Sequence, residues 1–451
     1  GLFTTAFSQE TIIRGFVYDE SSGEPMGFEK VRIVNATDSS FISGGVTDEN
    51  GFFSIPKNNI GKYLVVINSF KFQPIYDPIE VERPSGIINR KYYLKKRKDV
   101  QDLGEVRVNA ESQTKKTKVG MSVNKLTKKG IERIPSMGAE NDIIGAFSVT
   151  PGVVTTGDQG GQLYVRGGTP IQNKILLDGM TIYSPFHSIG FFSVFETELI
   201  KSADIYTGGF DATYGGRISS IMDIKYRDGN RKSIGGKLSV NPFLAKAVVE
   251  GPLFKKKTKT FSTGSYLLNI KQSLLEQTSS ALYKNINDGE GLPFAFTDMY
   301  GKLTFNSDAG SKVSFSGFRN VDEVNYTDAA IDWDTYGAAM NFVLVPGGSP
   351  VLIEGHVNYS SYATRFQENA APERTSSIYN ADVGFDFTYF LKNESEFNYG
   401  LNLITAETKF NTINESFTPI GFELPTLEVG LYANYRYVTP RIVIQPGMRL
   451  Q

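Results

Sequence analysis

The sequence predicts a fold dominated by β-structure: a small N-terminal β-sandwich, an α+β domain, and then the first part of a transmembrane antiparallel β-barrel. Three observations support this fold class. The chain has 32 Phe and 23 Tyr against one Trp, with 45 Gly, which suits the aromatic girdles and frequent turns of a membrane barrel. Apolar and polar residues alternate with a period of two in the second half. Glycine pairs punctuate residues 157–228, where they allow tight chain reversals.

The alternation is clearest in one strand of the predicted barrel, where two sets of residues point to opposite faces. The sets are Met299, Gly301, Leu303 and Phe305 against Tyr300, Lys302, Thr304 and Asn306. Short turns, such as 307–310 and 392–395, are expected at one end of the strands. Longer polar stretches, 277–293 and 367–377, are expected at the other end. This asymmetry favours a membrane barrel over a soluble sandwich.

About ten or eleven strands fit between Gly229 and Gln451, so we expect residues 229–451 to form the N-terminal, incomplete part of the barrel. The rest of the wall then lies outside this sequence or on a separate chain, because unpaired strand edges are prohibitive in lipid. No run of about 18 apolar residues occurs, which rules out a spanning helix but does not test spanning strands.

Charge and motif content exclude several classes of function. The chain has 47 Lys and Arg residues against 48 Asp and Glu residues. Its net charge therefore does not favour binding to nucleic acid. Cysteine is absent, which excludes disulfides and thiolate metal sites. There are two histidines, His187 and His356, and no GxSxG elbow, Walker lysine motif or GxGxxG fingerprint. The sequence therefore predicts no enzyme, no metal site and no cofactor.

The N-terminal region predicts a small β-sandwich over residues 11–97. Its candidate strands are separated by the turn signals SSGEP, ATDSS and DENG. They are Ile12–Tyr18, Lys30–Val34, Gly45–Thr47, Gly51–Ile55 and Tyr63–Ser69. Residues 1–10 are either the remnant of a signal peptide or a mobile terminus.

Several segments carry a resemblance to a known family. They are LYVRGG (163–168), ILLDGMTIYSPFH (175–187), ADIYTGG (203–209) and YGGRISSIMDIKYRDG (214–229). These segments resemble the plug domain of TonB-dependent outer-membrane receptors. The segments IIRGFVYDESSGEPMGFEKVRI and VTDENGFFSI are similar to the carboxypeptidase-regulatory-like sandwich that precedes the plug in one subgroup. The resemblance implies a plug over residues 119–228. The sequence itself predicts short helices at Leu126–Ile134, which Pro135 ends, and at Asn141–Ser148.

Residues 98–118 form a basic, polar linker that contains a candidate TonB box, the segment that pairs with the periplasmic energy-transducing protein TonB. Its alternating valines suit a free strand that adds to a sheet edge. The box residues are Leu103, Gly104, Glu105, Val106, Arg107, Val108, Asn109 and Ala110. The alternative is that this segment forms the last strand of the sandwich.

Two arginines are the candidate plug lock. Arg166, on a glycine-tight strand, is expected to be buried in an ion-pair network, and the alternative is a surface arginine. The family commonly has a second arginine in an arginine-glycine-proline triplet, but this chain has Thr207-Gly208-Gly209 there. Arg217 is the candidate substitute. The ligand-facing candidates are Tyr183, Phe186, His187 and Phe191, for which packing inside the domain is the alternative.

Two functions follow from this reading. The first is a TonB-dependent transporter of the Gram-negative outer membrane, with its N-terminal domain in the periplasm, that imports an unidentified nutrient. Its implied partners are TonB, outer-membrane lipid and a surface lipoprotein lid, with no nucleic acid. The second is a receptor-like structural subunit of a larger outer-membrane assembly or secretion complex, with a plug that never moves.

Overall fold

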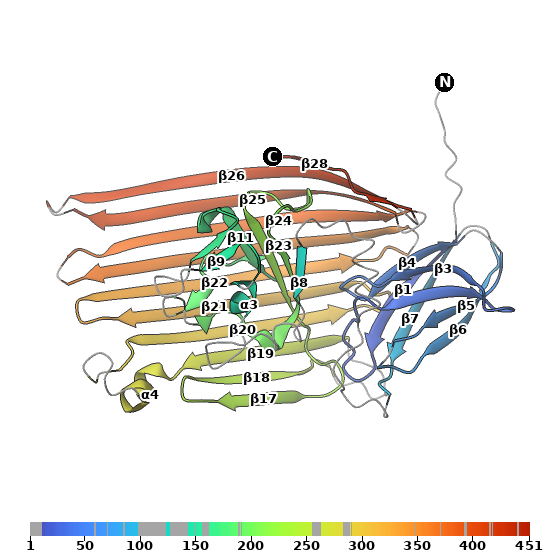
Figure 1. Ribbon diagram of the computed structural model, residues 1–451, viewed down its shortest axis with the longest axis horizontal. Coiled ribbons are helices and arrows are strands. Elements are labelled where there is room, and N and C mark those ends of the chain that lie inside the picture. Colours follow the sequence, from blue (N-terminus) through green and yellow to red (C-terminus); the bar gives the residue numbers. More distant parts are fainter. Residues whose placement is uncertain are drawn as a thin grey trace, which may run out of the picture.

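The structure is a computed structural model in which three parts follow one another along the chain (Figure 1). The described residues are 11–57, 60–69, 71–83, 86–97, 123–126, 143–148, 150–155, 162–187, 190, 192–254, 263–282, 289, 291–347, 349–369, 371–391, 395–414, 416, 418–439 and 442–451. No helix in this part of the chain is long and apolar enough to cross a membrane.

The N-terminal part is a β-sandwich of two sheets, with strand orders β4-β1-β7 and β3-β2-β5-β6. The strands are β1 (Thr11–Asp19), β2 (Lys30–Asn35), β3 (Phe41–Val46), β4 (Phe52–Lys57), β5 (Gly61–Ile67), β6 (Ile75–Val81) and β7 (Gly86–Leu94). The five predicted strands correspond to β1 to β5. The prediction missed β6 and β7. Strand β6 contains Pro78 and lies at the edge of its sheet, where proline is tolerated.

The central domain, which we define as the described residues from 123 to 228, is built on a mixed five-stranded sheet of order β12-β11-β16-β15-β8. These strands are β8 (Val123–Leu126), β11 (Asn173–Leu177), β12 (Met180–Thr181), β15 (Ile200–Tyr206) and β16 (Ser220–Tyr226). Shorter elements are α3 (Ile143–Ser148), β9 (Val153–Thr155), β10 (Leu163–Val165), η2 (Pro170–Gln172), β13 (Phe186–His187), β14 (Phe192–Ser193) and η4 (Thr197–Leu199). The predicted helix at 141–148 is present as α3, whereas Leu126 ends a strand and residues 127–134 lie outside the described part.

The C-terminal part is a single antiparallel sheet, the wall, in which each strand from β17 to β27 pairs with the next and β28 pairs with β26. The strands are β17 (Gly235–Val240), β18 (Leu244–Pro252), β19 (Gly264–Ser273), β20 (Phe294–Asn306), β21 (Lys312–Asn325), β22 (Ala329–Leu344), β23 (Val351–Glu368), β24 (Arg374–Phe390), β25 (Glu396–Ile413), β26 (Pro419–Val438), β27 (Val443–Ile444) and β28 (Gly447–Leu450). Helix α4 (Leu275–Leu282) precedes β20. The predicted antiparallel strands are confirmed, and the sheet has twelve of them where about ten or eleven were expected.

The wall has apolar residues on its exposed face and polar residues on its covered face. In β20 the predicted alternation is confirmed, because Met299 and Leu303 are exposed while Lys302 and Thr304 are buried. This arrangement is the reverse of a soluble sheet, and it matches a barrel wall with lipid outside and a polar lumen inside.

Two connections differ from the predicted pattern. The polar stretch 367–377 was expected to be a long loop, but β23 runs to Glu368 and β24 begins at Arg374. Polar residues therefore continue the strands at this end. The longer 277–293 stretch contains most of α4.

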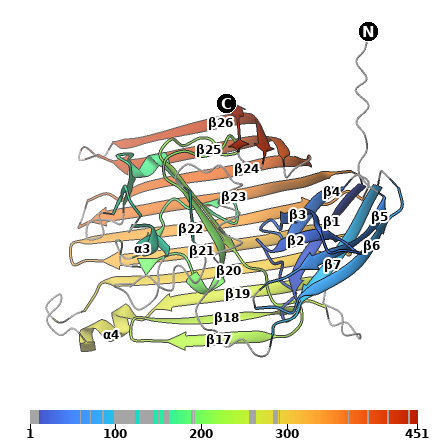
Figure 2. The ribbon, with the colours of Figure 1, turned by 45° about the vertical axis from the view of Figure 1, so that its right-hand side comes forward.

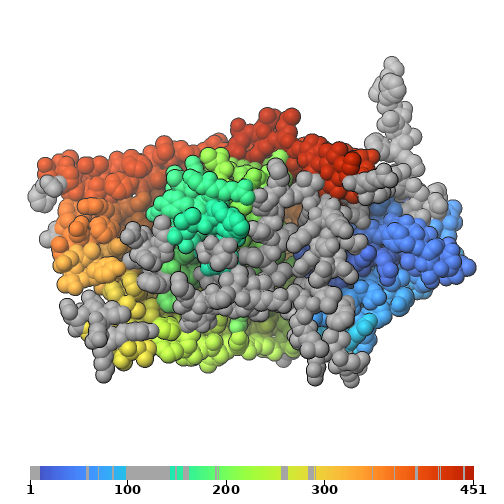
Figure 3. Space-filling view, viewed as in Figure 1, coloured from blue at the N-terminus to red at the C-terminus, as the bar shows by residue number. Residues whose placement is uncertain are grey.

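The central domain lies against the covered face of the wall (Figures 1 and 2). Buried apolar residues of both parts form one core, to which the wall contributes Val248, Leu267, Tyr300, Phe318 and Ala339. In Figure 3 the green central domain covers the middle of the wall, and the blue sandwich adjoins one end. The sandwich contacts Val345 and Leu352, which flank the short connection between β22 and β23.

Candidate functional site

A set of buried polar side chains joins the central domain to the wall, and we call it the seat. Its members are Asp178, His187, Glu196 and Asp228 of the central domain and Lys246, Lys271, Asp298, Lys302, Lys312 and Asp322 of the wall. Five carboxylates thus face four lysines and one histidine, so the seat is electrically balanced when His187 is protonated. Because these groups are removed from water, each needs its partner across the boundary.

Asp178 enters the seat from the tight turn between β11 and β12. Asp178 and Gly179 have φ values of 49° and 88°, as expected for the two central residues of a type I′ hairpin turn. The Asp178 carboxylate accepts hydrogen bonds from the Tyr300 hydroxyl and from Lys302 Nζ, the latter at 3.2 Å. The Asp178 backbone oxygen accepts a bond of 2.9 Å from Asn341 Nδ2. This turn is therefore held by two strands of the wall, β20 and β22.

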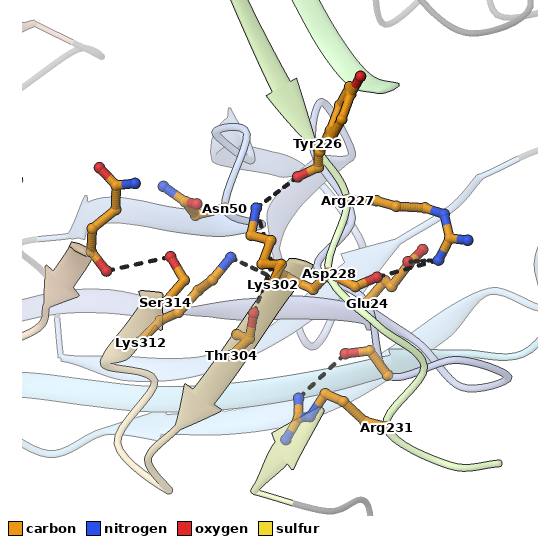
Figure 4. A network of polar contacts seen from close by, with 12 residues as sticks. Glu24, Asn50, Tyr226, Arg227, Asp228, Arg231, Lys302, Thr304, Lys312 and Ser314 are labelled. Carbon is orange, nitrogen blue, oxygen red and sulfur yellow. Dashed lines mark hydrogen bonds and ion pairs between the residues drawn. The ribbon is translucent and has the colours of Figure 1, made fainter. Parts of the chain in front are cut away.

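Asp228 lies where the central domain ends, between β16 and β17, and it accepts bonds from two wall residues (Figure 4). Lys312 Nζ is 2.6 Å from Asp228 Oδ2, and Thr304 Oγ1 is 3.1 Å from Oδ1. Burial opposes ionisation of Asp228, but the nearby lysines outweigh it and hold the pKa of this carboxyl well below its usual value.

Lys302 connects these two carboxylates. Its Nζ lies 3.2 Å from Asp178 Oδ1 and 3.6 Å from Asp228 Oδ1, and it donates a 2.8 Å hydrogen bond to the Tyr226 backbone oxygen. One wall lysine therefore contacts the central domain at three points, and it links Asp178 to Asp228 within the seat. A second pair, Lys246 and Glu196, lies nearby at 3.0 Å.

His187 forms the other side of the seat, between two wall aspartates. Its Nδ1 is 2.8 Å from Asp322 Oδ2 and its Nε2 is 2.8 Å from Asp298 Oδ1. Lys271 Nζ is 2.9 Å from Asp298 Oδ2 and donates to the Ser193 backbone oxygen at 3.0 Å. Since a neutral imidazole has one N–H, two carboxylate contacts favour the doubly protonated ring.

The geometry of His187 predicts a pH-dependent seat. Burial lowers the pKa of His187, but Asp298 and Asp322 outweigh that effect and raise it to about 8. A raised pKa gives stability that is complete below the unfolded value of about 6.5 and disappears as pH rises through about 8. We expect a loss on the order of 1–2 kcal/mol across this interval, measured as the unfolding free energy of the whole receptor in detergent.

The control for this prediction is the second histidine. His187→Gln should abolish the decline in stability between pH 6.5 and 8. His356→Gln should preserve it, because His356 lies outside the seat, where it pairs with Asp382 at 3.1 Å. An unchanged pH profile in His187→Gln would show that this imidazole does not hold the seat.

The structure places the two predicted lock arginines outside the seat. Arg166 is exposed, with a φ of 48°, in the turn after β10, so the expectation that it is buried was wrong. Strand β10, which precedes it, pairs with β9 of the same domain. Arg217 is half-buried and donates to the Gly216 backbone oxygen at 2.6 Å. Their role as a lock stays a prediction.

The structure places the ligand-facing candidates in different surroundings. Tyr183 is half-buried with its ring 6.0 Å from that of Tyr362 in the wall, and Phe186 packs on the central core. His187 is buried in the seat. Phe191 and the box residues 103–110 lie outside the described residues.

Sequence reasoning missed the lysines and aspartates of the seat, although a signal was present. Lys302 and Thr304 occupy the polar phase of an alternating strand, and Lys312 follows the turn after it. A lysine in the lumen-facing phase of a barrel strand requires a carboxylate from whatever fills the lumen. Asp178 and Asp228 could not be chosen as those partners without the fold.

Comparison with known proteins gives the same architecture. Residues 115–220 match the family model described as TonB-dependent Receptor Plug Domain. The FrpB iron transporter of Neisseria meningitidis is similar at a TM-score of 0.55 and 15% identity, over 73% of this chain and 57% of that one. The alcaligin receptor FauA of Bordetella pertussis gives 0.54 and 13%, over 74% and 55%.

The hemophore receptor HasR of Serratia marcescens, in complex with its hemophore HasA and heme, gives a TM-score of 0.53 and 15% identity, over 73% of this chain and 51% of that one. This chain therefore spans about half the length of these receptors. At such identities the likeness shows the fold. No curated protein sequence matches the chain.

Proposed function

We propose that this chain, which carries a TonB-dependent receptor plug domain and has the fold of those receptors, belongs to an outer-membrane transporter that imports a specific nutrient past its plug. From here the central domain is called the plug. The observation that carries the proposal is the seat, a charge-balanced set of ion pairs between a plug and the polar face of a wall that is apolar on its exposed face. We expect no enzymatic activity.

The seat suits a plug that moves. Each ion pair can exchange its partner for water when the plug shifts, and the wall face that the plug covers is rich in polar side chains. These include Ser265, Thr304, Ser314, Ser316 and Ser360. A wall of this kind tolerates water after displacement of the plug, as the lumen of a barrel must.

The position of the sandwich supports the proposed orientation. Short turns face the periplasm in outer-membrane barrels. The sandwich lies at the end of the wall that carries the short connections 307–311 and 345–350. We therefore assign the sandwich to the periplasm and the opposite end, with α4, to the cell surface.

Deletion of the candidate TonB box tests the proposal. Without residues 103–110 there is no strand for TonB to pair with, so we expect uptake to fall to the level of a strain that lacks TonB. Growth that depends on the receptor is the measurement. An internal deletion of the same length in the basic linker, at 111–118, is the control and should retain uptake.

The second candidate function is a structural subunit with a fixed plug. The absence of arginine at Thr207-Gly208-Gly209 and the docked sandwich favour it. Its expected result is the reverse of the first: deletion of the box leaves all growth intact, and loss of the whole chain disrupts an outer-membrane complex.

The nutrient is not specified by the seat. The similar receptors include one for alcaligin and one in complex with a hemophore and heme. We propose Tyr183 and Phe186 as the residues nearest to a ligand, since both lie in the plug segment that leads to the seat at His187. A surface lipoprotein lid remains a prediction from the resemblance.

A further inference from the structure

The N-terminal sandwich is docked on the wall through an aromatic patch. Phe16, Tyr18 and Phe52 are buried, and they pack with Val345 and Leu352 of the wall in a cluster separate from the sandwich core. The ring of Phe52 lies 5.5 Å from that of Phe390 in β24. The next residue, Phe53, points the other way into the sandwich core. The sandwich thus has one face for its own fold and one for the wall.

Arg14 adds hydrogen bonds to the apolar contacts between the sandwich and the wall. It is 2% exposed, and its guanidinium donates to the backbone oxygens of Ser349, at 2.5 Å, and Pro346. Its third bond, of 2.9 Å, goes to Asn89 Oδ1 within the sandwich. Among the described residues, the acceptors of its hydrogen bonds are neutral oxygens. Burial against neutral acceptors alone is a poor compensation for lost hydration, which suits a contact that opens.

The packing of the interface also suits separation. A cavity of about 380 Å³ remains between the sandwich and the wall. It is lined by Arg14, Phe16, Phe52, Lys91, Asp308 and Val345. This space is partly open to solvent and admits water, so this part of the interface is hydrated instead of close-packed, and the contact is weaker than a continuous core of the same extent.

The sandwich also holds the end of the plug. Lys225 Nζ is 2.8 Å from Glu49 Oε2. Arg227 Nη1 is 3.7 Å from Glu24 Oε1, and both residues are labelled in Figure 4. Arg231 donates its backbone N–H to the Ser22 oxygen at 2.9 Å. These contacts fall on residues 225–231, the stretch that also contains Asp228 of the seat. Holding this stretch therefore holds Asp228 against Lys312.

We propose that the sandwich is a latch: while it is docked on the short turns of the wall it keeps residues 225–231 in place, and the plug leaves its seat only after the sandwich lifts off. This inference rests on the proposed function, because a latch matters only for a plug that moves. The latch adds an order to the two steps of opening, with release of the sandwich before release of the plug. Force applied between residue 97 and residue 119 acts first on the sandwich contacts and then on the seat.

The test measures two cysteine reporters in the full-length receptor in detergent, which the cysteine-free sequence makes possible. Ser265→Cys, in the wall under the plug and fully buried, reports exposure of the seat region to a soluble maleimide. Val345→Cys, which is 7% exposed, reports lifting of the sandwich in a separate protein. Each reporter is compared with and without Phe52→Ala, which weakens docking but leaves the sandwich core intact.

The latch predicts that Phe52→Ala increases the labelling rate of both reporters by at least about tenfold, which corresponds to about 1.4 kcal/mol. Glu49→Gln should increase labelling at Ser265→Cys, whereas Glu80→Gln, in an exposed pair with Lys62 at 3.8 Å, should not. Faster labelling at 345 with an unchanged rate at 265 would overturn the latch. An unchanged rate at both positions would overturn the docking patch itself. Neither result depends on TonB or on the nutrient, so the proposed function is tested separately.

Discussion

Replacement of Lys302 by methionine is expected to destabilise the receptor by about 3–5 kcal/mol, the largest effect of any single substitution in the seat. The lysine contacts Asp178, Asp228 and the Tyr226 backbone oxygen, and its side chain is 6% exposed. Methionine has similar length but no charge, so it leaves buried carboxylates with fewer partners. Lys312 still compensates Asp228, whereas Asp178 loses its lysine. The measurement is the free energy of unfolding of the whole receptor in detergent at neutral pH.

The matched control is Arg319→Met on the neighbouring strand β21. Arg319 pairs with Asp334 at 3.0 Å, but the two side chains are 57% and 44% exposed. An exposed pair contributes at most about 1 kcal/mol, so this variant should remain close to the parent. Equal losses in the two variants would mean that the seat is not the strong link between plug and wall.

A disulfide between the plug and β28 is expected to abolish import. A Cβ atom added at Gly447 would lie 3.4 Å from the Cβ of Ala212. This distance is close to the Cβ–Cβ separation of two cysteines joined in a disulfide. The same Cβ would meet Asn434 Oδ1 at 2.2 Å, so that amide must rotate. With Ala212→Cys and Gly447→Cys oxidised, the plug is tied to the wall and receptor-dependent growth should cease.

Reduction of this disulfide should restore growth, and each single cysteine variant should behave as the parent does. These controls separate the cross-link from damage caused by the substitutions. Full growth of the oxidised double variant would show that the plug does not leave this part of the wall during transport.

The strands of the wall were predictable from the sequence because their chemistry is local. Alternation assigns Met299 and Leu303 to one face and Lys302 and Thr304 to the other, whatever surrounds the sheet. The turn at Asp178 was predictable for a similar reason, since an Asp-Gly pair tolerates positive φ at both positions. The first five strands of the sandwich were predictable from the turn signals between them.

The seat was not predictable because its pairs join residues far apart in the chain. Asp178 meets Lys302, and His187 meets Asp298 and Asp322, only after two domains are packed together. Arg166 illustrates the opposite error. The sequence around it resembles the plug of a known family and suggested a buried arginine, but the structure places its side chain at the surface in the turn after β10.

The central claim is that force on the inner side shifts a plug that is seated by charges on the wall. Labelling of Ser265→Cys in living cells tests it most directly, because this serine is fully buried while the plug is in place. We predict that a maleimide labels it faster in energised cells with an intact segment 103–110 than in cells without TonB or without that segment. Equal labelling in all three would contradict the claim and identify the plug as a fixed part of the wall.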